Sequence, residues 1–83
     1  HGYRTIFPVP LALAATWSPQ AHETAGRVAA VEGTSAGLHW TFAPMDDIAR
    51  DPRWGRISEG AGEDVYLGMQ IARARVSVSC SRR

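Results

Sequence analysis

Apolar and polar residues recur at helical spacing from residue 18 to residue 36. Ser18 and Pro19 form a favourable helix start, because serine can cap free backbone N–H groups and proline fits the first helical position. The recurring apolar positions after this start are Ala21, Ala25, Val28 and Ala29. Gly37 is a favourable stop. The pattern therefore predicts a helix whose alanine-rich face packs closely on a sheet.

The pattern changes to strict alternation immediately after this helix. Leu38, Trp40 and Phe42 alternate with the less apolar His39, Thr41 and Ala43, and Pro44 follows. Alternation with period two is typical of a strand with one buried face, and proline ends such a run. We therefore expect a strand over residues 38–43.

A charged loop and a second helix follow the expected strand. Residues 45–62 contain no apolar periodicity, and a loop of this length in a small domain is usually functional or disordered. Glu63 and Asp64 place negative charge where a helix dipole favours it, and helical spacing continues to Ala74. Residues 1–10 read as a loop because of their prolines, whereas residues 11–16 form a short apolar segment of uncertain type.

The order loop, helix, strand, loop, helix indicates an α/β fold cut from a larger unit. We expect about one strand, two helices and the loops of one face of a (β/α)8 TIM barrel. In such a barrel the loop after a strand lies on the catalytic face, so residues 1–7 and 45–62 would converge there. One strand cannot bury both of its faces. We therefore expect the rest of a parent enzyme to be needed for folding.

Composition excludes several classes of function. The chain has 83 residues and a net charge of +1, which argues against a general nucleic-acid binder. No apolar run reaches the roughly 20 residues of a membrane span, so no membrane partner is expected. The single cysteine permits no internal disulfide, and no His or Cys cluster has the spacing of metal ligands. No cofactor or metal is expected.

The candidate chemistry is concentrated in residues 50–56, which contain three arginines, an aspartate and a tryptophan. Arginine offers a rigid fork of donors, carboxylates accept from hydroxyls, and tryptophan offers a flat apolar face. A sugar suits this set. Phosphate would suit the arginines, but the neighbouring acids oppose it. Candidate residues are Arg56 and Arg4 for substrate binding, with Trp54, Asp47, Glu59, Arg50 and Asp51 in support.

Structural roles compete with binding at most of these positions. Arg50 and Asp51 are more typical of an ion pair that braces the loop. Trp54 is equally compatible with a core plug and with a sugar platform. Asp47 could cap a turn, and His39 in the middle of a strand is more often a core residue than a ligand.

Three blocks of the chain resemble bacterial β-glucosidases of glycoside hydrolase family 3. Residues 1–8 (HGYRTIFP) resemble the family's HG-x-R-T-x-FP segment. Residues 40–56 (WTFAPMDDIARDPRWGR) are similar to its W-x-x-AP-x-x-D-x-x-RDPRWGR run, and residues 59–68 (EGAGEDVYLG) to its E-G-x-GED-x-YLG continuation. The order and spacing of all three blocks match.

The resemblance implies a retaining glycosidase, in which an aspartate nucleophile and a glutamate acid/base cleave a β-glucoside or an oligosaccharide. Both catalytic residues lie downstream in the family, so none is expected here. The second arginine of RWGR binds the nonreducing-end glucose in the family, and Arg56 matches it. Arg4 matches the arginine of HG-x-R-T. Relatives are often periplasmic or secreted and sometimes cytoplasmic, so the location of this protein stays unknown.

The resemblance divides the chain in two. Residues 1–75 are expected to be part of the family's N-terminal barrel domain, supplying a glucose-binding subsite without catalytic groups. Residues 76–83 are β-prone and unlike the family, which suggests a frameshift or a truncation. The alternative is an inactive truncated product or a non-enzymatic interaction fragment.

Overall fold

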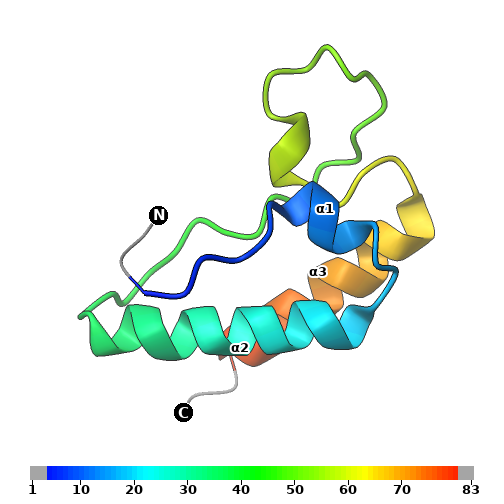
Figure 1. Ribbon diagram of the computed structural model, residues 1–83. Coiled ribbons are helices and arrows are strands. Elements are labelled where there is room, and N and C mark those ends of the chain that lie inside the picture. The colour runs from blue at the N-terminus through cyan, green and yellow to red at the C-terminus, as the bar shows by residue number, and fades with distance from the viewer. Residues whose placement is uncertain (1–3, 81–83) are drawn as a thin grey trace.

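The computed structural model describes residues 4–80, and within that range the protein is helical (Figure 1). Three α-helices and one 3-10 helix follow one another along the chain: α1 (Pro10–Ala14), α2 (Pro19–Ser35), η1 (Ile57–Glu59) and α3 (Val65–Cys80). None of these helices is long and apolar enough to cross a membrane, within the part of the chain that is described.

Helix α2 has the ends that its sequence predicts. Ser18 Oγ accepts a hydrogen bond from the Ala21 N–H at 3.2 Å, and Pro19 occupies the first helical position. At the other end, Gly37 adopts φ +89°. The Gly37 N–H donates to the Thr34 carbonyl, and the Leu38 N–H donates to the Gly33 carbonyl at 3.1 Å. This paired arrangement satisfies the last carbonyls of the helix and reverses the chain.

Helix α3 begins as predicted but continues further than the sequence suggested. The Asp64 carboxylate accepts from the Leu67 N–H at 2.7 Å, which is the geometry of a helix N-cap. The helix then runs through Val76–Cys80 despite the β-prone composition of these residues, and the expected frameshift or truncation stays a prediction. Val78 packs on α2, and tertiary packing therefore overrides its local β preference. Residues 81–83 lie outside the described range.

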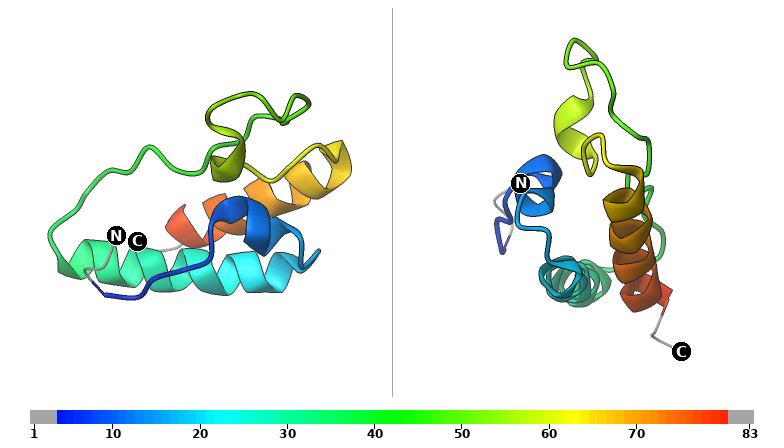
Figure 2. Two further views of the ribbon diagram at one scale, coloured as in Figure 1. Left: turned by 45° about the horizontal axis from the view of Figure 1, so that its top comes forward. Right: turned by 90° about the vertical axis from the view of Figure 1, so that its right-hand side faces the viewer.

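Helices α2 and α3 lie side by side and form the body of the molecule (Figures 1 and 2). Gly26 permits this close approach, because a Cβ at its position would lie 2.9 Å from Cγ2 of Val78. The buried core is small and consists of Ala14 from α1 with Leu67 and Ile71 from α3. His22 of α2 is the one polar residue that is fully buried among those described.

The predicted α/β class was wrong, since no strand and no sheet form between residues 4 and 80. Residues 38–43 run as irregular chain along the helix pair, and Trp40 and Phe42 are 80% and 87% exposed. Alternation alone does not create a strand, because the backbone also needs a neighbouring strand to complete its hydrogen bonds. The described chain offers no such neighbour. One strand of a (β/α)8 barrel is therefore not supported.

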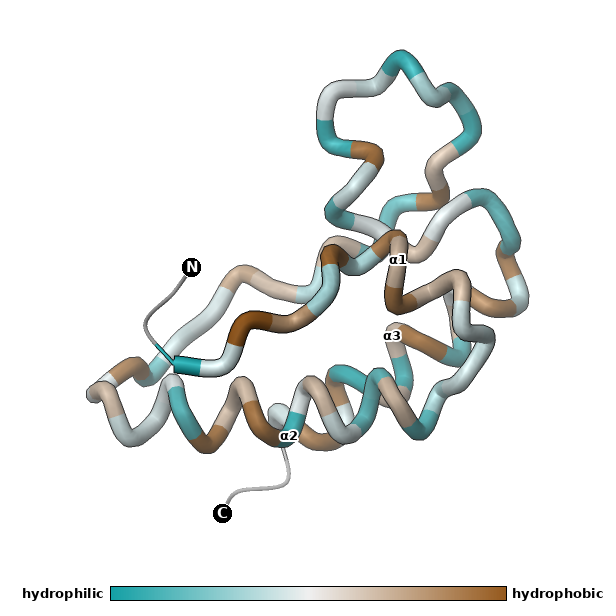
Figure 3. The backbone as a smooth tube through the Cα atoms, viewed as in Figure 1, coloured by the Kyte–Doolittle hydropathy of each residue, from teal (hydrophilic) through white to brown (hydrophobic). Residues whose placement is uncertain are grey.

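The N-terminal segment and α1 cover one side of the helix pair. The Thr5 N–H and hydroxyl both donate to the Glu32 carboxylate, which ties the N-terminal segment to the second half of α2. Helix α1 contacts α2 and η1. The loop over residues 46–56 precedes η1 in the chain. Its outer part projects away from the helices and is mostly hydrophilic (Figure 3).

Candidate functional site

The charged loop is closed at its base. The Ala49 N–H donates to the Gly62 carbonyl at 3.0 Å, and Ala49 itself is buried. Gly60 is also buried, and a Cβ there would lie 3.4 Å from the Asp47 carbonyl oxygen. Helix η1 lies within the segment of chain that these two contacts close. The two ends of the loop are therefore held close together.

Asp51 and Arg53 form one ion pair of the loop. Arg53 Nη2 lies 2.7 Å from Asp51 Oδ2, and its Nε lies 3.0 Å from Oδ1. The Arg53 backbone N–H also donates to Oδ1, at 2.9 Å. The side-chain bond to Arg53, then the backbone bond, lower the pKa of Asp51. The expected Arg50–Asp51 ion pair was wrong. The Asp51 carboxylate instead accepts hydrogen bonds from both the backbone and the side chain of Arg53, two positions further along the turn.

Arg56 and Glu59 form the second pair, at the start of η1. Arg56 Nε and Nη2 donate to the two Glu59 oxygens at 2.7 and 3.0 Å. This hydrogen bond raises the pKa of Arg56 and lowers that of Glu59, and the charge of Asp47 adds a smaller increase at Arg56. The structure thus pairs Arg56 with Glu59, and the charge of Asp47 acts on Arg56 more weakly, while the sugar-binding role of these residues stays a prediction.

Trp54 and Arg50 have different surroundings in the loop. Trp54 is 36% exposed, so it is neither a buried plug nor a fully open platform. The backbone N–H of Trp54 donates to the Asp51 carbonyl at 3.1 Å, which fixes the backbone of Trp54 within the turn. Arg50 lines an open cavity of about 420 Å³ between the loop base and α1, together with Leu11 and Ile57.

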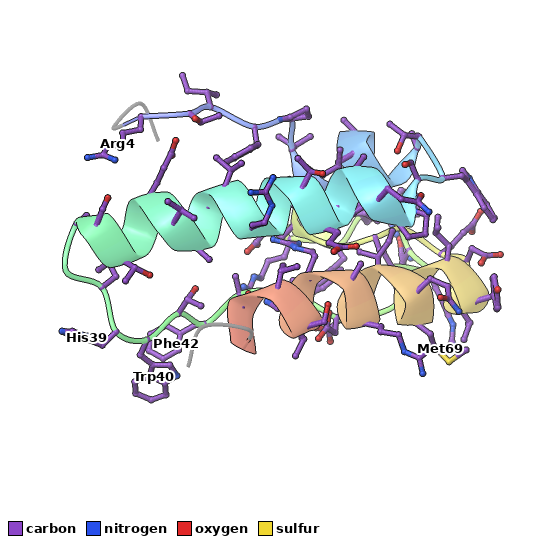
Figure 4. The ribbon with its side chains drawn as sticks, turned by 90° about the horizontal axis from the view of Figure 1, so that it is seen from below. Arg4, His39, Trp40, Phe42 and Met69 are labelled. Atoms are coloured by element: carbon purple, nitrogen blue, oxygen red, sulfur yellow. The ribbon has the colours of Figure 1, made fainter. Side chains whose placement is uncertain are left out.

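Arg4 is not brought to this loop. It lies on the N-terminal segment beside the second half of α2, with its side chain directed outward (Figure 4). The charged loop rises from the other end of the molecule (Figure 1). The expected convergence of residues 1–7 with residues 45–62 is therefore not observed, since it depended on a barrel. Residues 1–3 of the first motif lie outside the described range.

The sequence-based prediction did not include two residues, His22 and Arg75, that are buried or half-buried. His22 is 1% exposed, and neither ring nitrogen makes a hydrogen bond in the described structure. Burial lowers its pKa, and the nearby Arg75 adds to this decrease, whereas a contact with the Leu13 carbonyl opposes it. Arg75 is half-buried in α3, and desolvation lowers its pKa. The spacing of His22 to Ala25 and Ala29, three and seven positions further on, places it beside the apolar face and could have identified it as buried.

The charged side chains of the loop are suited to binding polar groups rather than to acid catalysis. A general acid needs a carboxyl with a raised pKa, whereas arginine partners lower the pKa of Asp51 and of Glu59. No group of three or more His, Cys, Asp or Glu side chains is placed to hold a metal ion between residues 4 and 80. Arginine donors and carboxylate acceptors that face solvent can instead bind hydroxyl groups.

Comparison with known proteins gives a family match over nearly the whole chain. Residues 1–78 match the glycosyl hydrolase family 3 N terminal domain. Curated relatives include a periplasmic beta-glucosidase of Salmonella typhimurium, 57% identical over 67 residues. They also include a putative beta-xylosidase of Formosa agariphila, 42% identical over 67 residues, and a lysosomal beta glucosidase of Dictyostelium discoideum, 36% identical over 72 residues.

The match covers much of this chain but little of each relative. It covers 81% of this chain for the first two relatives and 87% for the third. It covers 9% of each of these relatives. The chain therefore spans only a small part of the length of these relatives.

Proposed function

The chain belongs to the glycosyl hydrolase family 3 N-terminal domain family, and from this premise we propose that it supplies a glucose-binding loop to a β-glucosidase. The loop recognises a terminal nonreducing β-D-glucosyl residue. The nucleophile and the acid/base belong to other parts of the intact enzyme. The isolated chain is inactive under this proposal.

The observation that carries the proposal is the geometry of Arg56. Glu59 engages two of its nitrogens, Nε and Nη2, and so fixes the plane of the guanidinium. The third nitrogen, Nη1, keeps its donors, and the side chain remains 60% exposed. A fixed and solvent-facing fork loses little conformational entropy when it donates to sugar hydroxyls. The negative charge of Asp47 further raises the pKa of the Arg56 guanidinium, which keeps it charged.

Arg4 has a separate place in the proposal. Its segment lies apart from the loop in this chain, held by the bonds from Thr5 to Glu32. We assign Arg4 to the same sugar only in the intact enzyme, on the resemblance of residues 1–8 to the family motif. Its contribution is therefore testable apart from that of Arg56.

The sugar itself has two candidates. The 57% identical relative is named a beta-glucosidase, and the 42% identical one is named a putative beta-xylosidase. The two sugars share the ring hydroxyls that Arg56 can contact, so Arg56 does not discriminate between them. The higher identity supports glucose.

A chimeric enzyme tests the function. The matched stretch of the Salmonella typhimurium periplasmic beta-glucosidase would be replaced by the corresponding residues of this chain. We expect hydrolysis of an aryl β-glucoside in preference to an aryl β-xyloside. Loss of both activities in a folded chimera, or preference for the xyloside, would contradict the glucose assignment.

The role of Arg56 is tested within this chimera. Arg56→Ala should lower kcat/KM by about 10- to 100-fold, because charge-assisted hydrogen bonds to the sugar are lost. Arg53→Ala is the matched control, since it also removes one arginine of an ion pair in the same loop. Equal losses in both variants would show that the loop acts only through its shape.

A further inference from the structure

Helix η1 brings the side chains of Arg56 and Glu59 together at the foot of the charged loop (Figure 1). Arg56 is the N-cap residue of η1, and Glu59 is the last residue of the helix. Side chains three positions apart lie directly above one another in a 3-10 helix. The Glu59 N–H also donates to the Arg56 carbonyl, at 3.1 Å. The pair is therefore a local contact that this short stretch of chain forms by itself.

The backbone is fixed more firmly beside Glu59 than beside Arg56. Gly60, which follows Glu59, is buried, and a Cβ at its position would lie 3.4 Å from the Asp47 carbonyl oxygen. A Cβ at Gly55, which precedes Arg56, would meet no atom within 4 Å. Glu59 is therefore attached to the packed base of the loop, and its carboxylate can hold the longer arginine side chain.

The two hydrogen bonds between the side chains occupy one edge of the guanidinium. Nε and Nη2 of Arg56 donate to the two Glu59 oxygens at 2.7 and 3.0 Å. A carboxylate that accepts from both donors of one edge fixes the rotation of this planar group as well as its position. No residue between 4 and 80 accepts a hydrogen bond from Nη1. The Nη1 edge is therefore the one left for a ligand.

Asp47 does not orient Arg56 in the same way. It acts on Arg56 through its charge, and no hydrogen bond joins the two side chains in the described structure. A charge at a distance attracts the guanidinium without fixing its rotation. Among the acids of residues 4–80, Glu59 alone combines charge with two directed bonds to Arg56.

We propose that Glu59 is a positioning residue for Arg56, which holds the guanidinium so that its Nη1 edge meets the sugar. The proposal rests on the sugar-binding function proposed for Arg56 and adds that Glu59 itself does not contact the sugar. An unheld arginine has several rotatable bonds that must be ordered when a ligand binds, and this ordering weakens binding. Glu59 orders the side chain before the sugar arrives.

A double-mutant cycle in the chimeric enzyme tests the proposal. Glu59→Ala should lower kcat/KM for an aryl β-glucoside by about 3- to 10-fold, the loss expected when one long side chain must be ordered on binding. In an Arg56→Ala background the same substitution should have little further effect, because Glu59 acts only through Arg56. The loss should also divide between KM and kcat in the same proportion as in Arg56→Ala.

A conservative variant separates orientation of Arg56 from damage to the loop. Glu59→Gln keeps one oxygen that can accept from Nε or Nη2, so it should recover part of the activity that Glu59→Ala loses. The matched control is Glu63→Gln, which removes an exposed carboxylate that makes no bond to Arg56 and should leave kcat/KM nearly unchanged. Far-UV circular dichroism should show equal helix content in all variants.

Three results would overturn the positioning role. They are an unchanged kcat/KM in a folded Glu59→Ala chimera, an equal loss from Glu59→Ala with and without Arg56, and a Glu59→Gln variant no more active than Glu59→Ala. In each case Arg56→Ala can still lower kcat/KM, and the sugar-binding proposal then stands. An unchanged kcat/KM in Arg56→Ala is a separate result, which removes the function on which the positioning role depends.

Discussion

The charged loop and the α2–α3 helix pair are held together by different forces. The helix pair buries Leu67 and Ile71 and brings Val78 against Gly26. The loop buries little beyond Ala49 and Gly60, and its shape comes from turns and two ion pairs between neighbouring residues. Burial stabilises the helix pair, whereas the short-range polar bonds set the geometry of the loop.

This difference has a consequence for function. Exposed ion pairs contribute little net stability, because water solvates the separated charges well. They can nevertheless fix where a donor points. A recognition loop can therefore change its residues with little effect on folding, while a change in the helix pair affects the whole chain.

The largest effect on the free energy of unfolding is expected from a substitution in the helix pair. Ile71 is 3% exposed, and Ile71→Ala removes buried methyl groups at a cost of about 2–5 kcal/mol. Small domains have about 5–15 kcal/mol of stability in total, so any cooperative unfolding transition that the wild-type chain shows should weaken or vanish in the variant. Far-UV circular dichroism in guanidinium measures this. The control is Met69→Ala, since Met69 lies on the same helix but is 58% exposed.

The wild-type curve of that experiment also tests the expectation that the rest of the parent enzyme is needed for folding, which stays a prediction. A cooperative transition in the isolated chain would contradict it. If Met69→Ala lowered the midpoint as much as Ile71→Ala, burial would not explain the stability of the helix pair.

An intermediate effect is expected at His22. Its pKa is lowered mainly by burial, so the unfolded chain binds a proton more readily than the folded one. The contribution of His22 to stability is therefore complete above the unfolded pKa of about 6.5 and is lost as pH falls below it. His22→Leu should remove this part of the pH dependence and leave no unsatisfied ring nitrogen.

Unfolding midpoints between about pH 7.5 and 4.5 check this slope. The matched variant is His39→Leu, which changes a solvent-exposed histidine and should leave the His22 slope in place. A slope that survives in His22→Leu would assign the pH dependence to other groups.

The smallest effect on stability is expected in the loop. Asp51→Asn removes the charge that pairs with Arg53 but keeps an oxygen to accept the Arg53 backbone N–H. The unfolding midpoint should not change measurably, because both side chains are well exposed. Asp51→Ala also removes the acceptor, and amide exchange at Arg53 should then become faster. A midpoint shift as large as that of Ile71→Ala would place the loop among the elements that stabilise the fold.

Local signals in the sequence predicted both ends of α2 and the start of α3. Ser18, Gly37 and Asp64 act through bonds to residues within five positions, and the structure confirms each of them. The loop was also predicted, but the ion pair between Arg56 and Glu59 was not, although only three positions separate these residues. Local spacing did not identify the correct ion-pair partner of Asp51, because both Arg50 and Arg53 are close enough in sequence to pair with it.

The sequence by itself determined the family, the helix starts and the charged loop. These depend on the identity and order of neighbouring residues. Only the tertiary structure decided that residues 38–43 form no strand, that α3 continues through Val78, and that Arg4 lies apart from Arg56. Strand pairing, helix packing and convergence of loops each require a partner distant in sequence, and alternation or β preference along one segment does not specify whether that partner is present.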